Sequence, residues 1–402
     1  MDLKFIFTYL LRKKCDYCDF LSAPADLETK EKYVEALINE IKLNKNKMSE
    51  YVVDTVFIGG GTPSLLEENQ ISKIMSVLRD NCNMSENPEI TIECNPGTIT
   101  ESKLWEYKKS GINRISFGLQ SANDQELKSI GRIHNYAGFL ESYNLARKCG
   151  FDNINVDLMS ALPGQTLKSY EETLNKVVRL EPEHISAYSL IVEENTLMYD
   201  RVKKAQIKGI NILPDEESER KMYYLTNNIL RSNGYRKYEI SNYSKPGKEC
   251  KHNIGYWQRK EYLGFGIGAA SLYKENRYNN ISDINKYIEV LTNNIKENSI
   301  NNVENSSEVE NQVNILNSIV KNLQQLTERD RMEEFMFLGL RMMEGVSMEK
   351  FERYFGKPYM EVYGKVQKKM EDKRFLINDN GYVKLTEFGI DLSNYVMSEF
   401  LF

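Results

Sequence analysis

The first half of the chain alternates between short apolar runs rich in β-branched residues and longer segments with helical periodicity. The apolar runs predict six strands, at residues 4–9, 52–59, 89–95, 114–120, 153–158 and 184–192. Helices are expected between the first two strands and at residues 101–110, 136–148 and 169–180. Repeated strand–helix units of this kind predict an α/β fold around a parallel sheet.

Glycine-rich and polar clusters follow or end several of the predicted strands. A cysteine pair follows the first strand, Gly59-Gly-Gly-Thr-Pro63 follows the second, and Glu93 and Gln120 end the third and fourth. The pattern permits an open doubly wound sheet or a partial barrel, and in both folds ligands bind at the carboxyl ends of the strands. We therefore expect these clusters to converge at one mouth.

The second half of the chain has a different pattern. Residues 196–290 contain an expected helix at 218–231, a segment at 235–243 and a glycine-rich stretch at 264–268. Residues 292–325 are dense in Asn, Glu and Ser with few apolar residues. This composition predicts a loosely structured linker or insertion.

Three helical patterns, a hairpin and a final helix are expected after residue 327. The hairpin, at residues 375–385, would turn at Asp379-Asn-Gly381, and this order of elements resembles a winged helix. The predicted organisation has four parts, which are a barrel, an extension of the barrel, a linker and a winged-helix-like α+β domain, at residues 1–195, 196–290, 291–326 and 327–402.

The charge balance provides no general attraction for polyanions. Lys and Arg number 53 against 58 Asp and Glu, so the formal net charge is -5 and a nucleic-acid partner is not expected. The apolar run at residues 5–11 is too short to span a bilayer, and its basic residues follow it, whereas those of a signal peptide precede it. We predict a cytoplasmic protein, and its oligomeric state and peripheral membrane association stay open.

Two of the six cysteines form the pair Cys15-Asp-Tyr-Cys18. Two thiolates at this spacing can bind zinc, perform thiol–disulfide exchange or supply part of an iron–sulfur site. The other four cysteines are scattered and are expected to be buried as small apolar residues.

The segment Arg12-Lys-Lys-Cys-Asp-Tyr-Cys-Asp-Phe20 resembles the cluster loop of radical S-adenosylmethionine (SAM) proteins. In that superfamily Cys-x-x-x-Cys-x-x-Cys binds three irons of a 4Fe-4S cluster, and SAM chelates the fourth. The resemblance makes Cys15 and Cys18 cluster ligands and places Tyr17 with the cofactor-binding residues. Leu11 stands where the first cysteine is expected, so either a ligand has been lost or the sequence before Cys15 is in error.

Further motifs match superfamily positions that hold SAM, and they occur in the superfamily's order. They comprise Gly60, Gly61 and Thr62 after the second strand, Glu93 at the end of the third, and Gln120, Arg132 and Asp157. Their chemistry suits this role, since Arg can bind a carboxylate and Asp can bind hydroxyl or amino groups. Taken singly, Gln120, Arg132 and Asp157 are more often structural residues, the glycines could form an ordinary turn, and Glu93 could be a surface residue. It is their shared order and spacing that favour the SAM-binding role.

The resemblance extends from about residue 13 to the C-terminus and is to the coproporphyrinogen-oxidase-like family. The oxygen-independent coproporphyrinogen III dehydrogenases carry a further cysteine in Cys-x-Cys, whereas Asp19-Phe20 follows Cys18 here. His252-Asn-Ile-Gly-Tyr-Trp257 matches the family's haem-chaperone branch, although that branch often has His at the position of Ala270. The match implies His252 as a haem ligand, whereas its chemistry alone leaves a packing role open.

The resemblance implies a partial (β/α)6 barrel that binds a 4Fe-4S cluster, SAM and haem, with a smaller C-terminal α+β region. The implied function is a haem chaperone whose partners are haem and recipient haem apoproteins. Two alternatives remain, which are an oxygen-independent coproporphyrinogen III dehydrogenase and a degenerate scaffold without a complete cluster site.

Overall fold

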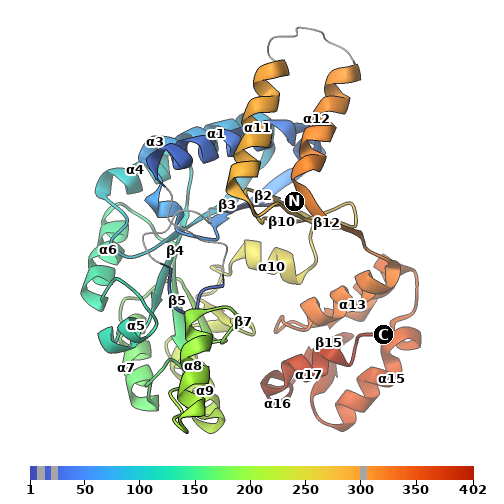
Figure 1. Ribbon diagram of the computed structural model, residues 1–402. Helices are drawn as coiled ribbons and strands as arrows, with labels where there is room; N and C mark the ends of the chain where they lie inside the picture. The colour runs from blue at the N-terminus through green and yellow to red at the C-terminus, as the bar shows by residue number, and fades with distance from the viewer. Residues whose placement is uncertain (7–13, 20–25, 299–305) are drawn as a thin grey trace.

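A computed structural model describes residues 1–6, 14–19, 26–298 and 306–402. Six strands lie side by side in chain order, and each neighbouring pair is parallel. They are β1 (Asp2–Ile6), β2 (Val52–Gly59), β3 (Asn83–Cys94), β4 (Arg114–Gln120), β5 (Ile154–Ser160) and β6 (His184–Ser189). Helices cover one face of this curved sheet (Figure 1), so the predicted partial (β/α)6 barrel is confirmed.

Later parts of the chain extend both edges of the parallel sheet to twelve strands. At one edge β8 (Asn242–Ser244) pairs antiparallel with β6, and β7 (Arg236–Glu239) pairs with β8. At the other edge β9 (Tyr262–Phe265) runs parallel to β1. The antiparallel strands β10 (Ala270–Tyr273), β11 (Asn276–Asn280) and β12 (Val320–Gln325) continue from it. The added strands cover edges that would otherwise expose unpaired backbone groups.

The helices of the barrel begin where the sequence supplies capping side chains. Asp26, Thr100, Asn135 and Thr166 each accept a hydrogen bond from a backbone N–H of the first helical turn. The main helices are α1 (Leu27–Leu43), α3 (Glu68–Asn81), α4 (Glu101–Lys109), α6 (Tyr136–Lys148) and α7 (Leu167–Val178). Shorter or later ones are α2 (Lys45–Ser49), η1 (Pro63–Leu65), α5 (Asp124–Ser129), α8 (Leu197–Ile207), α9 (Glu216–Ser232) and α10 (Lys251–Trp257).

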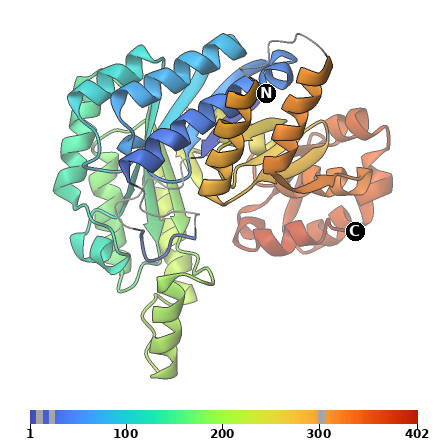
Figure 2. The same ribbon diagram turned by 45° about the horizontal axis from the view of Figure 1, so that its top comes forward.

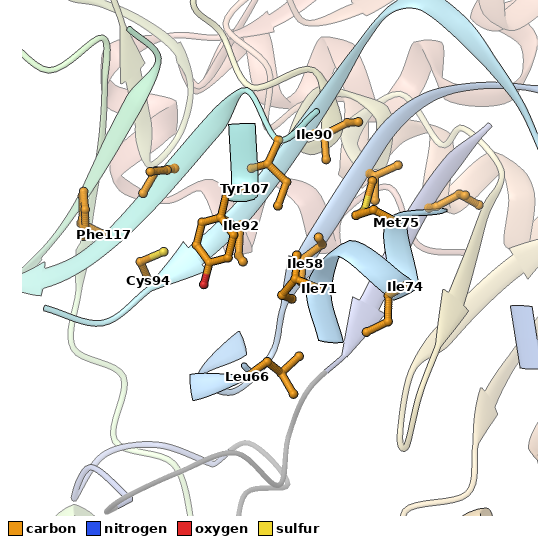
Figure 3. Close-up of a cluster of buried hydrophobic side chains, with 14 of the residues drawn as sticks. Ile58, Leu66, Ile71, Ile74, Met75, Ile90, Ile92, Cys94, Tyr107 and Phe117 are labelled. Carbon is orange, nitrogen blue, oxygen red and sulfur yellow. The ribbon is translucent and has the colours of Figure 1, made fainter. Parts of the chain in front are cut away.

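The principal hydrophobic core lies between the sheet and these helices. Figure 3 shows Ile58, Ile90, Ile92 and Phe117 of the strands facing side chains of α3 and α4, such as Ile71 and Tyr107. All of these side chains are almost completely buried. Removing this apolar area from water is the main favourable contribution to folding, at roughly 25 cal/mol per Å².

The structure differs from the expected linker between residues 291 and 326. The described part of this segment completes α11 (Ile284–Asn298) and forms α12 (Ser306–Ile319) and β12. Tyr287 and Leu291 are fully buried against α1, and the Tyr287 ring lies 5.6 Å from that of Tyr33. The composition misled because a few apolar residues, including Leu291, Ile315, Leu316 and Ile319, are enough to join the hydrophobic core.

The last part of the chain has the predicted winged-helix order. α13 (Glu328–Gly339), β13 (Val346–Ser347), α14 (Met348–Phe355) and α15 (Tyr359–Asp372) precede the hairpin β14 (Leu376–Asp379) and β15 (Tyr382–Leu385). β15 lies between β13 and β14, and α16 (Glu387–Asp391) and α17 (Ser393–Ser398) end the chain. Asn380 and Gly381 have φ values of 52° and 82°, as the predicted tight turn requires. The four domain boundaries themselves stay predictions.

A buried ion network joins the C-terminal part to the sheet, and the two parts lie beside each other in Figure 2. Arg259 donates to Glu334 of α13 over 2.8 Å and pairs with Glu275, while Arg277 also pairs with Glu334.

Among the described residues, no helix is both long enough and apolar enough to cross a membrane.

Candidate cofactor-binding site

A cavity of about 610 Å³ opens at the carboxyl ends of the parallel strands and continues into the barrel. Alternate residues of the strands line it, because successive side chains of a strand point to opposite faces. β4 contributes Arg114, Ser116, Gly118 and Gln120, and β5 contributes Asn155, Asp157 and Met159. All predicted site residues line this cavity except Gly60 and His252. The expected convergence of the sequence clusters is therefore observed.

The described part of the cysteine loop is fixed at the cavity by hydrogen bonds through Asp16. Its backbone N–H donates to Ile130 O over 3.1 Å, its carbonyl accepts from Met198 N, and its carboxylate pairs with Arg201 over 2.9 Å. Gly131 makes this approach possible, because a Cβ there would lie 2.5 Å from the Asp16 carboxylate. Cys15 and Cys18 are partly exposed, and burial raises the pKa of Tyr17 between them to about 12.

The glycine segment after β2 and the end of β3 meet through Glu93. The Gly60 backbone N–H donates to Glu93 Oε2 over 3.0 Å, and Gly60 has a φ of 86°. A Cβ on Gly59 would lie 2.6 Å from Glu93 Cδ, so the close approach requires glycine there as well. Asn95 Nδ2 donates to Thr62 Oγ1 over 2.9 Å and joins the same two segments.

Arg132 links four parts of the site. Its Nε donates to Gln120 Oε1 over 2.8 Å, its Nη1 donates to Asn95 Oδ1 over 3.2 Å, and its Nη2 donates to Gly118 O. The distance from Nη1 to Cys15 Sγ is 3.6 Å. These acceptors fix the guanidinium plane beside the cysteine loop, where a ligand carboxylate could add to its contacts.

Asp157 is oriented by a buried chain of hydrogen bonds. Asn155 Nδ2 donates to Asp157 Oδ1 over 2.7 Å, and Asn155 Oδ1 lies 2.6 Å from His184 Nδ1. His184 Nε2 lies 2.8 Å from the hydroxyl of Tyr238. Burial keeps the pKa of His184 well below its usual value and raises that of Asp157. A neutral His184 can donate to Asn155 and accept from Tyr238, which holds the Asp157 carboxylate in place.

His252 lies behind the wall of the cavity. It is 2% exposed, its Nδ1 lies 2.6 Å from Thr55 Oγ1, and its ring stacks on that of Phe57 at 5.1 Å. Phe57 and Asn253 line the cavity, so the motif at residues 252–257 reaches the cavity through Asn253. The assignment of His252 as a haem ligand stays a prediction, as do the cofactor roles of the other site residues.

Sequence reasoning missed several residues of the inner wall, namely Arg114, Ser116, Asn155, Ser186 and Tyr188. The signal was present, because Arg114 and Ser116 share the parity of Gln120 in a strand that was predicted correctly. Cys94 and Cys250 are buried, as expected of the scattered cysteines, but Cys94 also touches the cavity, and Cys250 Sγ lies 3.4 Å from Glu89 Oε1.

Comparisons with known families agree with the fold and the cavity. The profile of the radical SAM superfamily matches residues 6–177, and that of the HemN C-terminal domain matches residues 326–392. A solved structure titled "Coproporphyrinogen III oxidase (HemN) from Escherichia coli is a Radical SAM enzyme" superposes with a TM-score of 0.81. The match covers 99% of this chain and 89% of that one at 21% identity, and it shows the fold alone. The chain is thus a radical SAM protein with a HemN-type C-terminal domain.

Curated relatives define the family more narrowly. The chain is 34% identical to "Heme chaperone HemW" of Bacillus subtilis over 391 residues, which cover 96% of each protein. It is 33% identical over 387 residues to the protein of the same name in Lactococcus lactis, covering 96% of this chain and 94% of the relative. The chain belongs to the HemW family.

Radical SAM membership implies a 4Fe-4S cluster and SAM, and the residues present fit these two groups differently. The cavity offers an arginine, which suits the carboxylate of SAM, and the partly buried carboxyl groups of Glu93 and Asp157, which suit its amino and ribose hydroxyl groups. The cluster needs three thiolates from one loop, but this loop supplies Cys15 and Cys18 only. Leu11 lies outside the described residues, and in the described part no group of three metal-binding side chains occurs. The chain as it stands does not fit the complete cluster.

Proposed function

We propose that this chain is a haem chaperone, which binds haem and passes it to recipient haem apoproteins. The observation that carries the proposal is the 34% identity to the Bacillus subtilis heme chaperone over almost the whole of both chains. Asp19-Phe20 after Cys18 supports it further, because the family's dehydrogenases carry a cysteine at the second of these positions. The protein is proposed to act in the cytoplasm without a nucleic-acid partner, in keeping with its net charge of -5.

In this proposal SAM occupies the cavity and supports haem binding and transfer. Gly61 and Thr62 face its amino group, and Gly60 acts through its hydrogen bond to Glu93. Arg132 faces the carboxylate, and Glu93, Gln120 and Asp157 contact the remaining polar groups. The contacts of Arg132 with Gln120 and Asn95 support this assignment, because they fix the guanidinium before a ligand arrives. In radical SAM enzymes, SAM bound to a reduced cluster supplies a 5'-deoxyadenosyl radical.

The missing thiolate gives a direct test of the cluster site. We expect the unaltered chain to reconstitute with substoichiometric, labile iron, because a leucine side chain has no donor atom. Leu11→Cys should raise iron and sulfide toward about four each per chain, which is the content of the complete cluster. Anaerobic reconstitution followed by iron and sulfide assays of both versions measures this. A stable 4Fe-4S cluster in the unaltered chain would show that another residue supplies the third ligand.

The chaperone proposal is tested against the dehydrogenase alternative in one preparation. The Leu11→Cys protein, reconstituted anaerobically, is given coproporphyrinogen III, SAM and reductant, and the products are separated by chromatography. We expect no protoporphyrinogen, while an absorbance titration of the same preparation shows saturable haem binding. Turnover to protoporphyrinogen, or the lack of any saturable haem binding, would refute the proposal.

His252 is proposed as the haem ligand, and its position sets a condition on that role. The imidazole is hydrogen-bonded to Thr55 and stacked on Phe57, so binding of haem iron by His252 requires the α10 segment to move. We expect His252→Ala to change the haem absorption spectrum and weaken binding, while Tyr256→Phe, a nearby change in the same motif, leaves the spectrum unaltered. An unchanged spectrum after His252→Ala would remove His252 as a ligand and leave the family assignment intact.

A further inference from the structure

Arg114 is a buried cation without a close counterion. It is 2% exposed and stands at the amino end of β4, six residues before Gln120. Its Nε has no hydrogen-bond partner, and within the described residues no carboxylate lies at salt-bridge distance from its guanidinium. A buried charge in this state is strongly unfavourable unless a ligand or water satisfies it.

Glu89 and Asp157 are the two carboxylates that act electrostatically on Arg114, and both accept hydrogen bonds from other groups. Glu89 accepts from the backbone N–H groups of Lys251 and His252, over 2.9 and 3.1 Å, at the start of α10. Asp157 accepts from Asn155 and Ser116. Both acids contribute negative potential around Arg114, but neither forms a direct pair with it. The guanidinium hydrogen-bond donors therefore remain available to a group in the cavity.

A second unsatisfied group lines the same cavity. Asn242 lines the cavity from β8 and is 8% exposed, and its Oδ1 is buried without a hydrogen-bond partner. Its Nδ2 donates to Glu239, which fixes the side-chain oxygen as the free atom. β8 pairs with β6 through Asn242 and Ser186, and Ser186 also lines the cavity. The free oxygen of Asn242 is an acceptor, so it suits an N–H or O–H group of a ligand, whereas the Arg114 guanidinium suits an acceptor. Two such groups in one cavity indicate a polar ligand, since native proteins leave few of them unpaired.

We propose that Arg114 forms a carboxylate-binding subsite inside the cavity, near the amino ends of the strands. It is distinct from the contacts at the carboxyl ends of the strands, because Arg114 and Gln120 are separated by about 20 Å of strand. Guanidinium is well suited to a carboxylate, since its parallel N–H groups match the two oxygens. A propionate of haem supplies this chemistry. The amino-acid carboxylate of SAM is the alternative source, and in that case Arg132 would not hold it. The haem source rests on the proposed function, whereas the subsite itself does not.

The first test separates a ligand-binding arginine from a structural one. Arg114→Met keeps the length of the side chain and removes the unpaired charge, so thermal unfolding of the ligand-free protein should occur at the same or a higher temperature. Arg259→Met is the control, because Arg259 is also buried but is paired with Glu275 and Glu334, and this change should lower the unfolding temperature. A comparable loss of stability in Arg114→Met would overturn the proposal.

The second test identifies the carboxylate. Haemin and haemin dimethyl ester, in which both carboxylates are blocked, are titrated by absorbance, and SAM and decarboxylated SAM are titrated by calorimetry. For one of the two pairs, the unaltered protein should bind the ligand with a free carboxylate roughly tenfold or more tightly than the ligand without one. Arg114→Met should abolish that difference in affinity. Arg114→Lys should restore part of it. If Arg114→Met loses the preference for haemin over its ester, the subsite binds a haem propionate. If it loses the preference for SAM, the subsite binds the SAM carboxylate.

Two results of the second test distinguish a failure of the proposed function from a failure of the subsite. If haemin does not bind the unaltered protein, the chaperone proposal fails, and the SAM pair alone decides the subsite. If both preferences survive in Arg114→Met, or neither exists in the unaltered protein, no carboxylate is bound there and the subsite is refuted.

Discussion

The two faces of the parallel sheet differ in composition and in role. Along β4, Ile115, Phe117 and Leu119 point outward and are fully buried under helices, whereas Ser116 and Gln120 of the same strand line the cavity. The outer face is uniformly apolar, and the inner face carries charges, amides and hydroxyls. One strand thus supplies the apolar core on one side and ligand-binding groups on the other, with a period of two residues.

This difference teaches where stability and binding reside. Apolar burial on the outer face stabilises the barrel in proportion to the area removed from water. The inner polar groups bury little apolar area and so add little stability. Some of them, such as Arg114, are expected to lower it. Substitutions on the two faces should therefore separate unfolding from ligand binding.

The largest expected effect follows the loss of an outer aromatic ring. Phe117 is fully buried and meets the Phe139 ring edge-on at 6.0 Å. Phe117→Ala should lower the free energy of unfolding by about 3–5 kcal/mol, because it removes apolar contacts and leaves a cavity. Ser116→Ala, next to it on the inner face, should change stability by less than about 1 kcal/mol. Urea unfolding measures both, and equal losses would contradict the separation of the faces.

An intermediate effect is expected from Glu40, a buried carboxyl group within the outer helical layer. Burial raises its pKa to about 7, although it accepts hydrogen bonds from Tyr287, Gly266 and Asn280. A carboxyl whose pKa is higher in the folded state favours folding when protonated, so its contribution is full below the unfolded pKa of about 4.5 and is lost as pH rises through 7.

The corresponding measurement is urea unfolding of the unaltered protein and of Glu40→Gln at several pH values between 4.5 and 8. The unaltered protein should lose up to about 3 kcal/mol relative to the glutamine variant across this range, since each pKa unit corresponds to 1.36 kcal/mol. Parallel stability curves for the two proteins would show that Glu40 ionises normally.

The smallest expected change in stability, with a clear change in binding, concerns Arg132 on the inner face. Arg132→Met removes the donors to Gln120, Asn95 and Gly118 and the proposed contact with the SAM carboxylate. SAM affinity should fall by roughly 10- to 100-fold, as is typical for the loss of a charge-assisted pair. The unfolding temperature should fall less than in Phe117→Ala. Unchanged SAM affinity in calorimetry would exclude Arg132 from the binding site.

The outer face could be predicted from the sequence more completely than the inner one. The strands at 52–59 and 114–120 were predicted with their observed bounds, because apolar periodicity records burial directly. Arg114 and Asn155 share the parity of Gln120 and Asp157, which could have placed them on the inner face. A single polar residue in a strand, however, does not reveal its partners. The neighbours of His252 were also inaccessible, since Thr55 and Phe57 come from β2, far away in the chain.

Two further features required the folded structure. The Asn-rich segment after residue 291 forms helices whose few buried apolar residues, such as Ile315 and Ile319, join the hydrophobic core, and such packing across elements is not visible in composition. β3 begins at Asn83, six residues before its predicted start, because Asn83 and Met84 pair with Val52 and Val53. The polar first half of β3 gave no strand signal of its own.

Haem transfer is the most direct test of the central claim. The purified protein is loaded with haem, separated from free haem and mixed with a haem-free recipient protein, and the recipient's absorption spectrum is followed with time. The account predicts that the recipient acquires haem faster from the loaded chain than from a serum albumin–haem complex at equal haem concentration. Haem that stays on the chain, or transfer at the rate seen from albumin, would contradict a chaperone function on this radical SAM fold.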